Sequence, residues 1–275
     1  MCDTCGCGQR EPEAGAAPSR AGHHDHPHPH DHRHPSDHDH PHDPDHVHSA
    51  TAPARESATI RRVEVGADLL AANAEIAARN RAWLDERGVV AFNLISSPGS
   101  GKTLLLERTL DRLRGRVMCA VITGDVRTDR DARRLEGRGA PVRQIETLSA
   151  CHLNADQIAR CLPEVVRDGV RLLFIENVGN LVCPAAFDLG EHMKVVLLSV
   201  TEGEDKPLKY PAVFAAAGLA VITKTDLAAA VGWDRSAALH AIRSAHPGLF
   251  TFELSARTGE GMDAWVDYLT RAVGS

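Results

Sequence analysis

The chain has 275 residues, a formal net charge of -6 at pH 7 and no long run of Lys and Arg. Because nucleic acids and anionic membranes attract clustered basic side chains, this composition argues against both as partners. No segment reaches the roughly 20 uninterrupted apolar residues of a membrane span, and the polar start does not resemble a secretory signal. We therefore expect a cytoplasmic protein whose seven cysteines are metal ligands, reactive thiols or core residues rather than disulfide partners.

Residues 1–8 form the first of three predicted segments, a cysteine-rich metal motif. Cys2, Cys5 and Cys7 lie so close together that three thiolates can reach one ion without the help of a fold. Thiolates are soft ligands that suit nickel, zinc and copper, and we assign nickel to this motif. The alternative is a disordered terminus in which the cysteines have no shared role.

Residues 9–58 are predicted to be a disordered, histidine-rich linker. The segment has too few apolar residues to offset an ordering cost of about 1 to 2 kcal/mol per residue, and its prolines block helix formation. Neutral imidazoles on a flexible chain bind nickel or zinc, which indicates metal storage; the alternative is a purification tag. The proposed storage ligands are His23, His24, His26, His28, His30, His32, His34, His38, His40, His42, His46 and His48.

Residues 59–275 are predicted to form one α/β domain that begins with a helix. In the range 65–87, Leu69, Leu70, Ile76, Ala77 and Leu84 recur with helical spacing and should pack on the core, and Gly88 ends the helix. Short apolar runs then alternate with helical stretches, which indicates a mainly parallel sheet covered by helices on both faces. The predicted strands are 89–95, 117–123, 142–145, 172–176, 195–200, 220–223 and 250–254.

The first predicted strand leads into a phosphate-binding loop over residues 96–103, followed by a helix over 104–114. Glycines let backbone amides turn toward phosphates, Lys102 neutralises phosphate charge, and Thr103 can ligate magnesium. Ser96 replaces the first glycine of the usual pattern, which puts the opening conformation of the loop in question. The nucleotide ligands expected here are Gly99, Ser100, Gly101, Lys102, Thr103 and Leu104.

Two acidic residues follow predicted strands. Asp125 comes just after the strand ending at Thr123, and Glu176 ends another strand. In a parallel sheet the carboxyl ends of strands border the ligand crevice, so both acids are candidates for holding magnesium and, with Lys102, for catalysis. The alternative for each acid is a solvated side chain or a helix cap. Gly179, in the loop after Glu176, is expected to offer its amide to the γ-phosphate.

The nucleotide base is assigned from two loops near the end of the chain. Lys224 and Asp226 follow one strand, and Ser255 and Ala256 follow the last. A carboxylate at Asp226 can accept from both N–H groups of guanine, whereas adenine offers no such donor pair. The alternative role for Asp226 is a helix cap. Thr223 stands where guanine-binding loops usually carry Asn, and we expect it to loosen the tie between this loop and the phosphate loop.

A second metal site is predicted from Cys151, His152 and Cys183. The first two residues are adjacent, and Cys183 follows the loop expected to sense the γ-phosphate. Three nickel or zinc ligands on two loops leave a site that a second copy of the protein or water can complete, so we expect a dimer. Cys119 and Cys161 lie within a predicted strand and helix and are expected in the core.

Together these motifs resemble the HypB family of nickel-incorporation GTPases. The resemblance rests on the Cys2–Cys7 cluster, the His-rich linker, residues 96–103, Gly124-Asp125-Val126, Cys151-His152-Leu153, residues 176–181 and Cys183-Pro184. It implies a SIMIBI-class P-loop GTPase with slow, switch-like turnover that binds GTP, GDP and magnesium. It also implies a nucleotide-dependent homodimer, cooperation with a HypA-type metallochaperone and nickel delivery to the large-subunit precursor of nickel-iron hydrogenase. Thr223 departs from the Asn that is usual in the family.

Three functions compete on this evidence. The first is a GTP-hydrolysing nickel metallochaperone, for which the sequence identifies no residue that positions the attacking water. The second is nickel storage with a passive GTPase domain, and the third is a P-loop kinase for a small metabolite, which gives no reason for the metal ligands. A urease-type nickel GTPase is the related alternative, with a different arrangement of cysteine and histidine expected.

Overall fold

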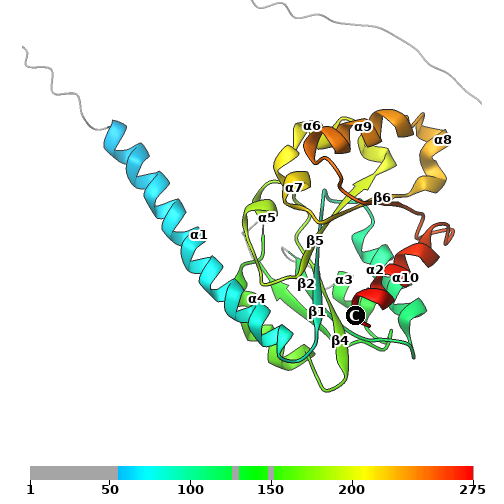
Figure 1. The fold of residues 1–275 in the computed structure, drawn as a ribbon, viewed down its shortest axis with the longest axis horizontal. Helices are drawn as coiled ribbons and strands as arrows, with labels where there is room; N and C mark the ends of the chain where they lie inside the picture. The colour runs from blue at the N-terminus through cyan, green and yellow to red at the C-terminus, as the bar shows by residue number, and fades with distance from the viewer. Residues whose placement is uncertain (1–54, 126–129, 148–151, 275) are drawn as a thin grey trace, which may run out of the picture. The chain divides into compact units, whose positions relative to one another are not determined.

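The computed structural model describes residues 55–125, 130–147 and 152–274 (Figure 1). Cys2, Cys5 and Cys7, the twelve linker histidines and Cys151 lie outside these ranges, so their roles remain predictions. The boundaries placed at residues 8 and 58 also remain predictions. Among the described helices, none has the combination of length and apolar character that a membrane span requires.

The described residues form one seven-stranded parallel sheet in the order β3-β2-β4-β1-β5-β6-β7. Each strand coincides with a predicted one apart from a shift of a few residues at its ends, so the predicted fold class is confirmed. The strand that precedes the phosphate loop is central because it pairs with β4 on one side and β5 on the other. The strands are β1 Val90–Ser96, β2 Met118–Asp125, β3 Val142–Glu146, β4 Val170–Glu176, β5 Met193–Ser199, β6 Leu219–Thr223 and β7 Thr251–Glu253.

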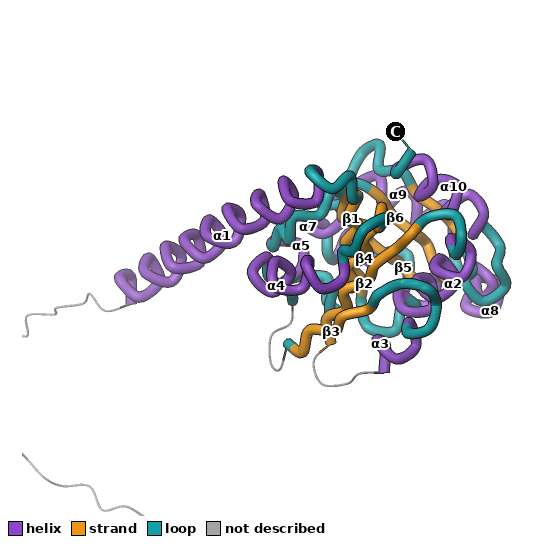
Figure 2. The backbone as a smooth tube through the Cα atoms, turned by 90° about the horizontal axis from the view of Figure 1, so that it is seen from below, coloured by secondary structure: helices purple, strands orange, loops and turns teal. Residues whose placement is uncertain are grey.

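Helices cover both faces of this sheet, as Figure 2 shows. On one face, α2 and α10 enclose a core that includes Leu105, Phe174 and Trp265. On the other face, α1 and α4 pack near β2 and β4, while α7 and α9 pack near β5 and β6. The helices are α1 Arg55–Asp85, α2 Lys102–Leu113, α3 Arg130–Leu135, α4 Ala155–Val165, α5 Cys183–Ala186, α6 Lys206–Lys209, α7 Pro211–Ala216, α8 Ala228–Val231, α9 Arg235–Ala245 and α10 Met262–Ala272, with short 3-10 turns η1 Val200–Glu202 and η2 Thr225–Leu227.

Helix α1 differs from its predicted packing. Ala77 and Leu84 are buried as expected, but Leu69 and Leu70 are exposed, so their predicted contact with the core was wrong. The reason is that Asn73 is the first buried residue along the described surface of the helix, and the preceding turn has no core to pack against. The buried stripe is therefore Asn73, Ala77, Asn80 and Leu84, in which polar and apolar side chains alternate along one helical face.

Candidate nucleotide site and adjoining metal-ligand loops

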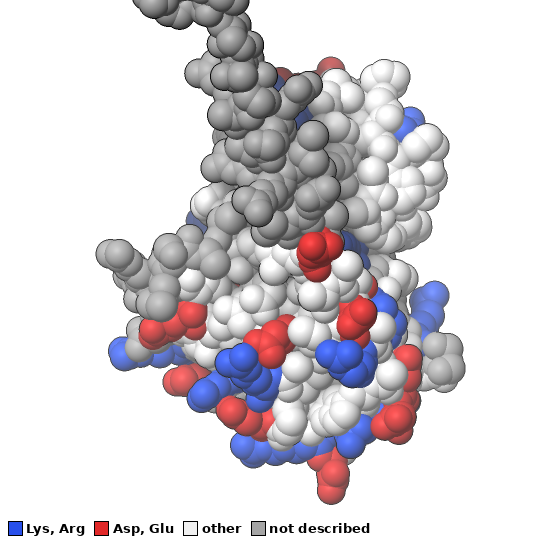
Figure 3. Space-filling model, turned by 90° about the vertical axis from the view of Figure 1, so that its left-hand side faces the viewer, with Lys and Arg blue, Asp and Glu red and all other residues white. Residues whose placement is uncertain are grey.

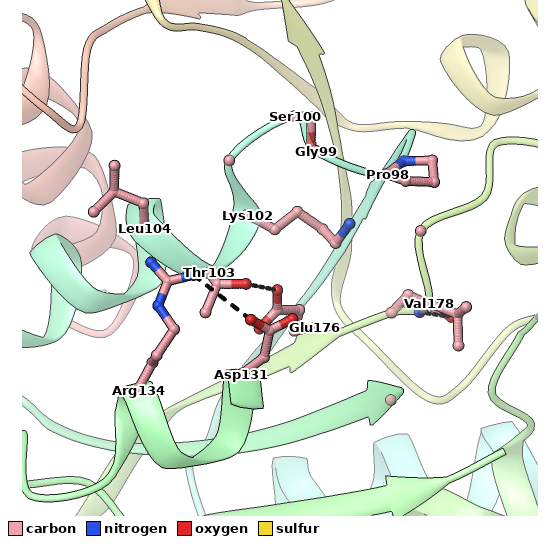
Figure 4. A pocket seen from close by; sticks show the side chains of 14 residues that line it. Pro98, Gly99, Ser100, Lys102, Thr103, Leu104, Asp131, Arg134, Glu176 and Val178 are labelled. Atoms are coloured by element: carbon pink, nitrogen blue, oxygen red, sulfur yellow. Dashed lines mark hydrogen bonds and ion pairs between the residues drawn. The ribbon is translucent and has the colours of Figure 1, made fainter. Parts of the chain in front are cut away.

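The loop between β1 and α2 borders a cavity of about 530 Å³ at the carboxyl edge of the sheet (Figure 4). This is the edge at which ligands bind in open parallel sheets. The opposite wall comes from the end of β4 with the loop that follows it, and from α3. The lining residues are Pro98, Gly99, Ser100, Gly101, Lys102, Thr103, Leu104, Gly124, Asp131, Arg134, Glu176, Asn177, Val178 and Gly179.

The phosphate loop adopts the turn that its glycines allow. Gly99 and Gly101 have φ of +75° and +100°, which side-chain-bearing residues rarely adopt. Ser96 has no positive φ, so a glycine is not required there and the question raised by its substitution is settled. Its hydroxyl instead accepts hydrogen bonds from Ser100 Oγ and, at 2.8 Å, from Lys102 Nζ. Burial lowers the pKa of Lys102, and the nearby carboxylate of Glu176 counteracts that shift.

Thr103 and Glu176 form the part of the cavity that suits a hard cation. Thr103 Oγ1 donates to Glu176 Oε1 at 2.7 Å, and Glu176 Oε2 is buried without a hydrogen-bond partner among the described residues. Burial raises the pKa of Glu176 to about 7, although the Lys102 ammonium opposes the shift. A buried, unpartnered carboxylate oxygen next to a hydroxyl is the oxygen-donor set that magnesium prefers. The backbone of Asp125 ends β2 nearby, and its side chain lies outside the described part.

Asp131 and Arg134 line the same cavity but were not predicted from the sequence. Both belong to α3, and Figure 4 shows them on the side facing Thr103 and Glu176. Arg134 Nε pairs at 2.6 Å with Glu107 on α2, a side chain that also pairs with Arg138. The one signal in the sequence is the run of charges over residues 129–134 after a strand, and such a run is equally typical of a solvated helix. Helix α3 thus brings one acid and one base to the phosphate side of the cavity.

The loop after β4 lies directly against the phosphate loop. A Cβ on Gly179 would come within 3.0 Å of the Pro98 Cα, so only glycine fits this approach without displacement. The preceding Asn177 is buried, and its Oδ1 accepts from the amides of Val178 at 3.0 Å and Leu153 at 3.3 Å. A movement of this loop would therefore displace both the phosphate loop and Leu153.

The predicted base-binding loop after β6 is tied to the phosphate loop by two hydrogen bonds. Thr223 Oγ1 donates to the Ser100 carbonyl at 2.7 Å, and Lys224 Nζ donates to the Gly99 carbonyl at 2.7 Å. The expected loosening at Thr223 was therefore wrong, because a hydroxyl supplies the donor that the amide of Asn would offer. Lys224 has φ of +59°, a strained value for a non-glycine residue, which turns the following residues away from β6.

Asp226 is held by the other predicted base loop. Ser255, which is fully buried, donates its hydroxyl to Asp226 Oδ1 at 2.6 Å. Asp226 is not an N-cap residue, since Lys224 and Leu227 occupy those positions of η2 and α8. Ala256 is also buried beside this pair. These residues do not line the cavity described above; they meet it through the ties from Thr223 and Lys224.

The described residues of the predicted second metal site lie on two neighbouring loops. The His152 ring lies 3.9 Å from the Phe187 ring, centroid to centroid, and Cys183 begins the helix α5 that ends just before Phe187. Burial lowers the pKa of His152, which favours the neutral imidazole that a metal requires. Within the described ranges, which exclude Cys151, no three candidate ligands converge on one point. Cys119 and Cys161 are buried core residues, as predicted.

Comparison with known proteins assigns the chain to a family. Residues 90–249 match the model of the CobW/HypB/UreG nucleotide-binding domain. The chain is 50% identical over 209 residues to the hydrogenase maturation factor HypB of Escherichia coli K12, an alignment that covers 76% of this chain and 72% of the relative. This chain belongs to the HypB family of hydrogenase maturation factors. HypB of Azotobacter vinelandii is 47% identical, with 82% of this chain and 74% of that relative covered.

Solved structures of the family share the fold. HypB of Archaeoglobus fulgidus superposes with a TM-score of 0.69 at 41% identity and covers 74% of this chain and 99% of its own. HypB of Helicobacter pylori, solved in complex with nickel, has a TM-score of 0.69 at 36% identity and covers 73% of this chain and 94% of its own. The family model spans the phosphate loop, Glu176, Cys183 and Asp226, so these sites lie within the shared nucleotide-binding domain.

Proposed function

We propose that this chain is a cytoplasmic, GTP-hydrolysing nickel metallochaperone that delivers nickel to the large-subunit precursor of nickel-iron hydrogenase. One observation carries the proposal. The Asn177 side chain lines the nucleotide cavity and accepts a hydrogen bond from the amide of Leu153, the residue that follows His152. The nucleotide site and a candidate metal ligand are therefore one hydrogen bond apart, which is the arrangement a nucleotide-controlled metal carrier needs.

The cavity and the two base loops beside it supply the parts needed to bind and cleave GTP. Lys102 stabilises charge on the transferring phosphoryl group, while Asp226 accepts from guanine and is oriented by Ser255. Thr103 and Glu176, with Asp125, would hold magnesium, which neutralises charge on the β- and γ-phosphates when bound. Asp131 faces the phosphate side from α3, and we assign it the task of orienting the attacking water. Turnover is expected to be slow, because a switch must persist in its GTP state.

Coupling between nucleotide and metal follows from the packing around Leu153. Its side chain fills the space above Gly124, where an added Cβ would come within 2.8 Å, and its amide is held by Asn177. When the loop carrying Asn177 and Gly179 responds to the γ-phosphate, the segment after His152 must move with it. Nucleotide state then changes the metal geometry and, by linkage, metal changes nucleotide affinity by the same factor.

The remaining parts of the proposal concern metals and partners. The nitrogen and sulfur donors of His152 and Cys183, with Cys151, suit nickel or zinc, and a related HypB was solved with nickel. Cys2, Cys5 and Cys7 are assigned to a second nickel site, and the linker histidines to storage. A nucleotide-dependent homodimer would complete the Cys183 site, and the proposed partners are a HypA-type metallochaperone and the hydrogenase precursor.

The test compares nickel affinity and dimer mass of the full chain with GDP and with a non-hydrolysable GTP analogue, alongside Cys183→Ala. We expect the analogue to drive dimerisation and shift nickel affinity, and the substitution to remove the shift. Asn177→Ala should reduce the shift while leaving nickel bound. If nucleotide changes neither quantity, the storage function is the correct one, and deleting residues 23–48 would then abolish the protein's role in nickel supply.

A further inference from the structure

Two asparagines on α1 stand out because they are buried in a stripe that apolar residues could fill. Asn73 is 8% exposed and Asn80 4% exposed, and because they are seven positions apart they lie on the same face of the helix. Burying an amide is unfavourable unless its polar atoms find partners. A helix that only had to dock on the domain would do so with leucines, so the partners of these amides indicate their purpose.

Each asparagine bridges the same two loops. Asn73 Oδ1 accepts from the amide of Ala155 at 2.9 Å, while its Nδ2 donates to the Asp188 carbonyl at 2.7 Å. Asn80 Nδ2 donates to the carbonyls of Ala155 at 2.8 Å and of Leu189 at 3.0 Å. The two amides therefore fix the backbone of the segment after His152 against the backbone of the segment after Cys183.

Helix α1 packs tightly against the loop that follows α5. Gly190 has φ of +92°, and a Cβ there would come within 2.5 Å of the Asn80 Cβ and 2.7 Å of the Ala77 carbonyl oxygen. Arg81 adds hydrogen bonds of 2.7 and 2.8 Å to the two carboxylate oxygens of Asp188. One face of α1 therefore contacts three successive residues of this loop, Asp188, Leu189 and Gly190.

The bridged segments are the ones that carry the candidate metal ligands. His152 stands three residues before Ala155, and its ring lies against the ring of Phe187, which directly precedes Asp188. Short stretches of chain therefore connect the Ala155 and Asp188 backbones to His152 and to the α5 segment that begins with Cys183. Figure 1 places α1 beside α4, the helix whose first residue is Ala155.

We propose that Asn73 and Asn80 are positioning residues of the metal site at His152 and Cys183, and that α1 sets the spacing of the two ligand-bearing loops. The inference rests on the proposed function. Asn177, which lines the nucleotide cavity, holds the backbone of the His152 loop at Leu153, and the two α1 asparagines hold it at Ala155. Metal affinity then depends on α1 as well as on nucleotide, although α1 supplies no ligand to this site.

The experiment titrates the full chain with Ni²⁺ and follows the thiolate-to-nickel charge-transfer absorption that disappears when Cys183→Ala is introduced into the same background. Asn80→Asp, which places a carboxylate against two carbonyls, should weaken this Cys183-dependent binding roughly 10- to 100-fold, as loss of groups that orient metal ligands does. Asn73→Asp keeps the acceptor for Ala155 and should lose less. GTP affinity should be unchanged in both. Glu75→Ala, at an exposed position of the same helix, is the matched control and should match the wild type.

The outcomes separate this inference from the proposed function. If the wild-type chain shows no Cys183-dependent nickel signal, the proposed metal site itself is wrong. If the wild type shows the signal and both asparagine variants retain it at wild-type affinity, the positioning role is overturned. If Asn80→Asp does not fold, as judged by GTP binding, Gly190→Ala replaces it in the experiment. Its added methyl group should push the loop away from α1 and weaken the Cys183-dependent nickel signal. Wild-type nickel affinity in Gly190→Ala would likewise overturn the inference.

Discussion

The nucleotide loops and the metal-ligand loops are neighbours, but they are held in different ways. The nucleotide loops hold one another: Thr223 and Lys224 bind phosphate-loop carbonyls, and Thr103 binds Glu176, all at one edge of the sheet. The loop after His152 is held instead by side chains from other elements, Asn177 at Leu153 and the α1 asparagines at Ala155. A self-contained site keeps its geometry, whereas a site held from two directions can be adjusted from either.

The largest expected effect tests whether the nucleotide site is self-contained. Lys102→Ala removes the buried ammonium that lines the cavity, and GTP hydrolysis should fall about 100- to 1000-fold, as when one group that stabilises the transition state is lost. Phosphate release measures this. Nickel binding by the nucleotide-free protein at Cys183 should not change, and a parallel loss there would show that the two regions are not separable.

A second change addresses the base. Asp226→Asn removes the carboxylate proposed to accept from two guanine N–H groups. At about 1.5 to 3 kcal/mol for each hydrogen bond to a charged group, GTP affinity should fall at least roughly 100-fold. Xanthosine triphosphate carries a carbonyl in place of the exocyclic amine, so the variant should bind it better than GTP. Equilibrium titration of the variant with both nucleotides measures this preference. If the variant still prefers GTP, Asp226 does not contact the base.

The pH dependence of magnesium binding gives a smaller, graded effect. Burial raises the pKa of Glu176 from 4.5 to about 7. Without a cation, the Glu176 carboxyl is therefore protonated in the folded protein between pH 4.5 and 7 but ionised in the unfolded chain. The stability of the folded protein thus falls as pH rises through this window. Magnesium requires the ionised carboxylate, so its affinity for the GDP-bound protein should fall about tenfold per pH unit below 7. Titrations at pH 6 and 8 measure this. In Glu176→Gln the difference should vanish; if it persists, another group is responsible.

The smallest effect concerns the tie between the base loop and the phosphate loop. Thr223→Val keeps the shape but leaves the Ser100 carbonyl without its donor, at a cost of about 1 kcal/mol, so GTP affinity should fall roughly fivefold. Thr223→Asn restores a donor and should bind GTP like the wild type. Equal affinity in all three proteins would mean that the tie does not position the phosphate loop.

The parts of the fold that follow from local pattern were predictable. The inner strands such as β1, β4, β5 and β6 were predictable because a strand buried on both faces is a continuous apolar segment, and the glycines at 99 and 101 indicated the loop between β1 and α2. Glu176 lines the cavity at the carboxyl edge of the sheet, where residues that end parallel strands meet, and its role there stays a prediction. Each of these inferences needed only neighbours in sequence and the rule that relates strand ends.

The parts that depend on distant partners were not predictable. Thr223 was expected to loosen its loop, since nothing in the sequence shows that its hydroxyl reaches Ser100. Leu69 and Leu70 continue the helical spacing of Asn73 and Ala77, but spacing does not reveal where the core ends. The asparagines did leave a signal, because Asn73 and Asn80 fall in register with Ala77 and Leu84 on what reads as an apolar stripe. A polar residue in such a position indicates a partner on another element.

The central place of β1 has a consequence for how the chain is made. β1 ends at the phosphate loop, yet its partners β4 and β5 begin only at Val170 and Met193. During synthesis, at about 5 to 20 residues per second, the phosphate loop must therefore emerge well before the sheet that shapes it. The amino-terminal cysteines and histidines are complete earlier still, and the ligation proposed for them needs no sheet. A nascent chain of this design would meet metal before it can meet nucleotide.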